Sequence, residues 1–138
     1  PLFRHCEVVH LQVESKGDKT MTIITNILIT IVALQHIAFL VLEMFLWDKP
    51  IGRLVFGLTK EAATISKTLA ANQGLYNGFL AAGLIWGLSL GAEGTNIIIF
   101  FLSCILLAGI FGGMTVSPKI FLIQALPALI ALVLLLLS

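Results

Sequence analysis

The sequence predicts an all-α integral membrane protein, a bundle of four transmembrane helices. Of its 138 residues, 59% are hydrophobic and only 11% are charged, and the mean hydropathy is +1.07. Soluble globular domains carry about 25% charged residues, so this composition is typical of a chain embedded in lipid. The apolar residues form four long blocks, at residues 23–47, 71–90, 97–114 and 120–137. Each block approaches the roughly 20 residues that a helix needs to cross the hydrocarbon.

The first 20 residues differ from these blocks. They are polar, they carry three basic and three acidic side chains, and they lack the apolar core of a signal peptide. Residues 16–18 can be encoded by a bacterial ribosome-binding consensus placed just before Met21. We therefore interpret residues 1–20 as an upstream leader outside the fold, and residues 21–138 as one four-span domain. A genuine short tail is the alternative.

The distribution of basic residues predicts the orientation of the first block and of those that follow. After Met21 the basic residues lie in the first and third connections only: Lys49, Arg53, Lys60, Lys67 and Lys119. The second connection carries only Glu93. Short cytoplasmic loops are enriched in Lys and Arg, so both chain ends should lie on the side of a bacterial inner membrane that faces away from the cytoplasm. Trp47 and Trp86 are placed as interfacial anchors would be.

The first connection contains two predicted features. Thr59 precedes the sequence KEAATISKTLA, which is typical of a capped helix that runs without a break into the second block. Upstream, residues 47–58 mix Pro50, Gly52 and Gly57 with apolar and basic side chains. This mixture favours a segment that lies along the membrane surface against anionic headgroups.

The first block contains two ionisable residues, His36 and Glu43, which are seven positions apart. Two helical turns place them on one face, about 10 Å apart along the axis. The second block runs in the opposite direction and has its amides at the same depth, and the fourth block adds one more amide there. The expected polar layer in the cytoplasmic half therefore consists of His36, Glu43, Asn72, Gln73, Asn77 and Gln124. We expect Glu43 and Asn77 to face each other.

The polar layer has two interpretations. Ionisable side chains inside a membrane usually face the bundle interior and mark a functional site. Amides and His36 can instead act as interhelical hydrogen-bonding groups, each contributing about 0.6 kcal/mol. A lone Asn or Gln favours the structural role, whereas an acid and a base on one face favour a site. The resulting hypothesis is a pocket for a small lipophilic or cationic ligand, with Glu43 as its counter-charge and Tyr76 or Phe39 as its apolar wall.

Small residues in the later blocks predict close helix packing. Glycines recur at every fourth position in two blocks: Gly74 and Gly78, Gly83, Gly87 and Gly91, and Gly109 and Gly113. The same glycine-rich faces are candidates for contact with a second copy of the chain, in a homo-oligomer. In the fourth block, Pro127 should free a backbone carbonyl about one turn earlier, near Gln124.

The stretch ANQGLYNGFLAAG at residues 71–83, together with the first block that carries His36 and Glu43, resembles a family of small four-helix bacterial inner-membrane proteins. That family is known by a domain-of-unknown-function label. The resemblance covers residues 21–138 and implies a four-span bundle. It implies no activity, and it assigns no catalytic residue.

Several kinds of chemistry are not expected. After Met21 the only cysteine is Cys104, within an apolar block, which argues against a disulfide or a thiolate metal cluster. No glycine pattern for nucleotides and no basic field for nucleic acid is present. One histidine with one glutamate is too little for a metal site, and we expect no cofactor.

Three functional classes remain. The first is a binding protein for the small ligand described above. The second is a small proton-coupled exporter in which Glu43 and His36 exchange protons for a substrate, and the third is an assembly subunit without a ligand. No residue pattern fixes a reaction, so the sequence favours a protein that is not an enzyme, and an enzyme acting on a lipid-soluble substrate stays an open alternative.

Overall fold

The computed structural model describes residues 2–138, with side chains described from Lys19 onward. Within this range the chain contains helices and their connections and no strand. The elements are α1 (Leu2–Met44), α2 (Pro50–Phe56), α3 (Lys60–Ser89), the 3-10 turn η1 (Gly91–Gly94), α4 (Thr95–Thr115), α5 (Pro118–Ile120), the π turn η2 (Phe121–Ala125) and α6 (Leu126–Leu137). The all-helical prediction is confirmed.

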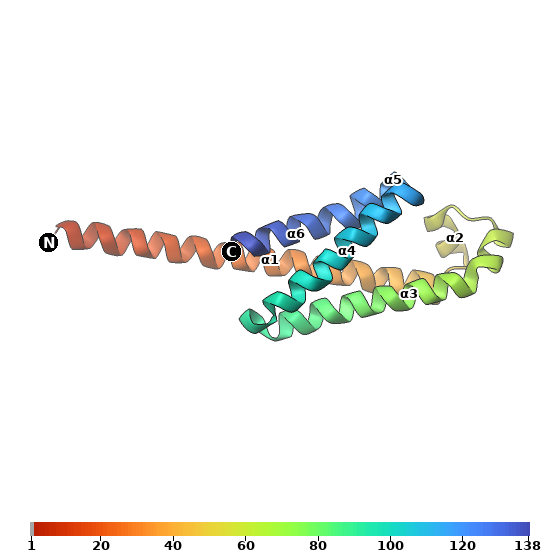
Figure 1. The fold of residues 1–138 in the computed structure, drawn as a ribbon, viewed down its shortest axis with the longest axis horizontal. Helices are drawn as coiled ribbons and strands as arrows, with labels where there is room; N and C mark the ends of the chain where they lie inside the picture. Colours follow the sequence, from red (N-terminus) through yellow and green to blue (C-terminus); the bar gives the residue numbers. More distant parts are fainter. Residues whose placement is uncertain (1) are drawn as a thin grey trace.

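The long helices pack in chain order and then close back on the first. Helix α3 packs on α1, α4 packs on α3, and α6 packs on both α4 and α1. Helices α3 and α4 meet at η1 and spread apart toward the opposite end, which holds α2 and α5, as Figure 1 shows. The first turns of α1 extend away from the other helices, and the C-terminus lies beside α1 (Figure 1).

In the part of the chain that the structure describes, three segments are long and apolar enough to cross a membrane: Lys19–Met44, Gly91–Thr115 and Pro118–Leu137. The second predicted span, α3, is long enough but lacks the hydropathy, because amide side chains interrupt its apolar sequence. Large hydrophobic side chains are exposed on every long helix, which is typical of a surface that contacts lipid. The described residues therefore contain three candidate membrane-spanning helices.

The first helix differs from the predicted block at both ends. It begins at Leu2 rather than at residue 23, and it ends at Met44, so Trp47 lies in the connection and not in the helix. The chain turns here because Pro50 holds the preceding Lys49 in an extended conformation, with φ −82° and ψ 160°. The side chains of residues 1–18 lie outside the described part, so their assignment as a leader stays a prediction.

Helix α3 begins as the sequence predicts. The Thr59 side chain accepts a hydrogen bond from the Ala62 backbone N–H at 3.2 Å, which makes Thr59 the N-cap. From Lys60 the helix continues to Ser89 without interruption. A helix of 30 residues is about 45 Å long, so α3 extends beyond the hydrocarbon thickness of a bilayer.

Glycines bring the helices into close contact inside the chain. A Cβ at Gly74 would lie 3.0 Å from the Glu43 Cβ, and one at Gly83 would overlap the ring of Phe101. At Gly109 it would lie 2.6 Å from the backbone nitrogen of Ala125. These faces are therefore occupied by neighbouring helices of the same chain.

Pro127 changes the hydrogen bonding of the last helical segment. Proline has no N–H, so the carbonyl of Ile123, four residues earlier, lacks its helical donor. The Gln35 side-chain Nε2 of α1 donates to this oxygen, and the Leu126 N–H bonds to the Phe121 carbonyl in the π turn. The prediction that Pro127 frees a backbone carbonyl about one turn earlier is confirmed. Its partner is Gln35, a residue that the sequence did not single out.

We expect Gln35→Leu to destabilise the protein by about 1 kcal/mol or more, because it leaves the Ile123 carbonyl without a donor. Pro127→Ala restores a backbone N–H, so Gln35→Leu should cost less in that background than in the wild-type chain. A double-mutant cycle of unfolding free energies in detergent micelles measures the difference. Additive effects of the two substitutions would contradict this role of Gln35.

Candidate functional site

The polar layer contains a hydrogen-bonded chain of three side chains, His36, Asn77 and Glu43, which we call the amide bridge. The His36 Nδ1 lies 2.8 Å from the Asn77 Oδ1, and the Asn77 Nδ2 donates to the Glu43 Oε2 at 2.7 Å. His36 is fully buried, Asn77 is 5% exposed, and Glu43 is half-buried. The predicted contact between Glu43 and Asn77 is confirmed, and the same amide also reaches His36.

The register of α1 and α3 brings these side chains together. The two helices are antiparallel, so one amide on α3 lies between two residues that are two turns apart on α1. Glycine makes the approach close, since Gly74 packs against Glu43 one turn from Asn77. The ring of Phe39 stands edge-on to the His36 ring, with centroids 5.8 Å apart.

The hydrogen bonds of the amide bridge define proton positions. Because the Asn77 Oδ1 is an acceptor, the neutral His36 carries its proton on Nδ1. The His36 Nε2 then holds a lone pair, and this buried atom has no hydrogen-bond partner among the described residues. Glu43 accepts from Asn77 and needs no proton for this bond.

Rotation of the Asn77 amide by half a turn would reverse both bonds. Its Nδ2 would then donate to the His36 Nδ1, which moves the histidine proton to Nε2, and Glu43 would have to donate as a carboxylic acid. One amide thus links the protonation of an acid to the tautomer of a histidine about 10 Å further along α1.

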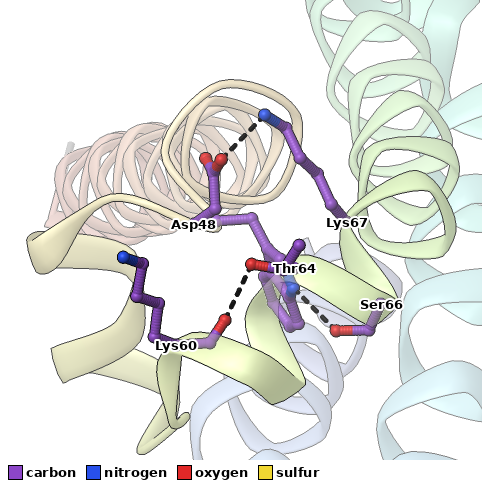
Figure 2. A network of polar contacts seen from close by, with 6 residues as sticks. Asp48, Lys60, Thr64, Ser66 and Lys67 are labelled. Carbon is purple, nitrogen blue, oxygen red and sulfur yellow. Dashed lines mark hydrogen bonds and ion pairs between the residues drawn. The ribbon is translucent and has the colours of Figure 1, made fainter.

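The connection between α1 and α3 holds this register at one end. The Lys67 ammonium of α3 pairs at 2.8 Å with Asp48, just after α1, and Figure 2 shows this contact. Next to it, the Trp47 Nε1 donates to the Ser66 hydroxyl at 2.9 Å. The bond from Lys67 holds the pKa of the Asp48 carboxyl below its usual value. The pair therefore persists until the pH falls below the normal range of an aspartate, and then it is lost.

Helix α2 lies within this connection and exposes apolar side chains: Ile51, Leu54 and Val55. Leu54 is 79% exposed. The backbone of α2 is close to the end of α1, because a Cβ at Gly52 would overlap the Leu46 carbonyl. The placement of this segment along the membrane surface stays a prediction.

The other three residues of the predicted layer are elsewhere. Asn72 and Gln73 are exposed on α3, away from the amide bridge. Gln124 is half-buried and donates to the Ile105 carbonyl of α4 at 3.4 Å. The structure therefore joins His36, Glu43 and Asn77 and leaves the remaining three outside this chain of bonds.

An open groove of about 680 Å³ lies on α3 near the end of α1. Met44, Thr68 and Asn72 are among its lining residues, and of the predicted ligand-binding residues only Asn72 is among them. Among the described side chains, no three His, Cys, Asp or Glu lie close enough to hold a metal ion.

Sequence reasoning missed two polar groups, the half-buried Gln35 and the buried Thr25. The Gln35 side chain donates to the Ile123 carbonyl. The sequence offers only two hints of this contact, which are that Gln35 is an amide next to His36 and that another block contains a proline. Thr25 is 1% exposed, and its hydroxyl has no hydrogen-bond partner. A threonine in an apolar block carries no signal of burial, because its hydroxyl can bond to its own helix.

Comparisons with known proteins give a family and a bacterial relative. The family model DUF1304, described as a protein of unknown function, matches residues 30–136. The uncharacterised protein YpaA of Lactococcus lactis subsp. lactis (strain IL1403) is 36% identical over 115 residues, which cover 82% of this chain and 97% of that protein. No solved structure matches the chain.

Proposed function

We propose that this chain, which belongs to the DUF1304 family of proteins of unknown function, binds a small lipophilic or cationic ligand at the amide bridge. The observation that carries the proposal is Glu43, a half-buried acid held by Asn77 in an apolar helix pair. The only ion pair given by the described side chains joins Lys67 to Asp48, so Glu43 has no basic partner there. A ligand cation would supply that missing charge.

The proposal places the protein in the bacterial inner membrane, with α3 as the second of four spans. Helix α3 packs along α1, and Asn77, one of the amides that lower its hydropathy, is buried in the amide bridge. The relative YpaA is bacterial, and the basic residues after Met21 cluster in the first and third connections. This distribution supports a topology with both ends outside the cytoplasm.

A second candidate is the proton-coupled exporter, and one feature favours it. The Asn77 amide bonds to an acid at one end and to a base at the other. Protonation of Glu43 would favour the reversed amide and change the His36 Nε2 from an acceptor to a donor. Such a link could couple proton uptake to a change at a buried atom that has no partner.

The test uses tetraphenylphosphonium, a lipophilic cation, as the probe. Glu43→Gln should weaken its binding to the purified protein by about tenfold or more, because it removes a charge partner but keeps the volume and the acceptor for Asn77. The control is Glu61→Gln, which makes the same change of charge at the exposed first turn of α3. Equilibrium dialysis measures binding, and thermal unfolding checks that both variants fold.

Equal binding by wild type and Glu43→Gln would show that Glu43 is not the counter-charge and would reject the binding proposal. The transporter is distinguished by vesicles that contain the protein and a pH-sensitive dye. Proton flux that requires the cation and disappears in Glu43→Gln would establish exchange rather than binding alone.

A further inference from the structure

One face of α3 has a polar, uncovered half. Asn72 is exposed there, between Ile65, which is 85% exposed, and Tyr76, which is 53% exposed. These residues are spaced by about one or two turns, so they share one side of the helix. Gln73 is exposed beside them. We call Ile65, Asn72 and Tyr76 the amide face.

The same side of α3 is covered by another helix further along. Gly83 and Gly87 follow Asn72 and Tyr76 by eleven residues, which is about three turns, so they lie on the same side. Gly83 packs on Phe101 and Gly87 on Ile98, both of α4. Toward the amide face α4 diverges from α3, as Figure 1 shows. One half of this side is therefore packed against a helix, and the other half is uncovered.

Lipid is a poor cover for the amide face. An amide without a hydrogen-bond partner is unfavourable in hydrocarbon, and Asn72 lies six residues beyond the Ser66 contact of Trp47, toward the membrane centre. An Asn side chain is short, which limits its reach back to the headgroups. A polar partner within the membrane would satisfy it.

We propose that the amide face is the contact surface for a second copy of this chain, in a parallel dimer. The groove beside Asn72 gives this surface a recess for side chains of the other copy. An amide carries both a donor and an acceptor, so the same amide on two copies can bond to itself.

The membrane explains why like residues would meet. Copies inserted with the same orientation can be related by a twofold axis only along the membrane normal, so equivalent residues lie at equal depth. The dimer rests on the proposed placement of α3 in the membrane, but it does not depend on the ligand.

The first experiment is cross-linking in lipid vesicles, with both native cysteines, Cys6 and Cys104, replaced by serine. In the Ile65→Cys variant, the new cysteine should form a disulfide with the same cysteine of a second copy under mild oxidation. Leu107→Cys on α4 is the matched control, because Leu107 is 68% exposed and lies outside the amide face. Equal cross-linking at both positions would mean random collision and would overturn the proposal.

The second experiment measures dimer dissociation by energy transfer between labelled copies as the lipid is diluted. Asn72→Leu should raise the dissociation constant about three- to thirtyfold, the range expected for interhelical polar contacts in membranes. Asn96→Leu removes an exposed amide at the start of α4 and should leave dissociation unchanged. No effect of Asn72→Leu would show that lipid headgroups or water satisfy this amide, and it would overturn the dimer.

A third measurement separates failure of the dimer from failure of the membrane placement. Ile85→Cys, near the far end of α3, should resist an impermeant thiol reagent in sealed vesicles. Labelling of this cysteine would place α3 outside the lipid and overturn both proposals. Resistance to labelling, combined with no Ile65→Cys disulfide, would overturn the dimer alone.

Discussion

Asn77→Leu is expected to destabilise the protein by about 2–4 kcal/mol, because it leaves two polar side chains without a partner at once. His36 is fully buried and has no second partner, so it bears the full penalty of a lost hydrogen bond. Glu43 is half-buried and recovers part of its loss from its surroundings. Leucine is close to asparagine in size, so packing changes little. Unfolding of the variant in detergent micelles measures the loss.

The matched control is Asn72→Leu, the same substitution on the same helix at an exposed position. In micelles dilute enough to keep the chain monomeric, it should change the unfolding free energy by less than about 0.5 kcal/mol. In a His36→Phe background, Asn77→Leu should cost less than in the wild-type chain, because one of the two stranded groups is gone. Equal losses at positions 72 and 77 would contradict the amide bridge.

Gly109→Ala should be the second strongly destabilising substitution, by about 1–3 kcal/mol. The added Cβ would lie 2.6 Å from the Ala125 nitrogen and 2.9 Å from its Cα, so backbone atoms would have to move. The displaced segment is the π turn, so α4 and α6 would separate there. Alanine favours a helix by about 1 kcal/mol over glycine, which offsets only part of this loss.

Gly112→Ala is the control on the same helix. Its Cβ would first meet the Ile120 side-chain Cγ2 at 3.0 Å, and its three nearest neighbours are all side-chain atoms of Ile120, so a shift of one side chain and of no backbone atom relieves the contact. We expect it to be neutral or slightly stabilising. Ala125→Gly should recover part of the stability lost in Gly109→Ala, because it removes the Cβ that stands 2.9 Å from the new methyl group. Thermal unfolding of the wild type and these three variants tests this order, and a loss in Gly112→Ala as large as in Gly109→Ala would contradict it.

The sequence predicted well that Glu43 and Asn77 lie at one level on neighbouring helices, because the level follows residue number along a helix of known rise. Glu43 and Asn77 were placed at one level on antiparallel helices, and their side chains do meet. The Thr59 cap was also predictable, since it depends on a few adjacent residues.

The sequence predicted less well which way a residue faces around a helix. Asn72 and Gln73 share the level of the polar layer, yet they are exposed, because the side of α3 that meets α1 is the one that carries Gly74 and Asn77. An apolar helix in lipid has no polar side to mark its exterior, so amphipathicity gives no direction. The Gln35 contact was missed for the same reason, since it joins residues 88 positions apart.

The divergence of α3 and α4 has a consequence for the surrounding bilayer. The helices are tightly joined at η1, where a Cβ at Gly94 would overlap the Gly87 carbonyl, and they spread toward the end that holds α2. At that end α4 lies against η2 and α6 instead, so it leaves one side of α3 uncovered. Under the proposed placement, lipid chains of the leaflet beside the basic connection would cover this side of α3 in a single copy. Pairing of two copies through the amide face would have to displace those lipids.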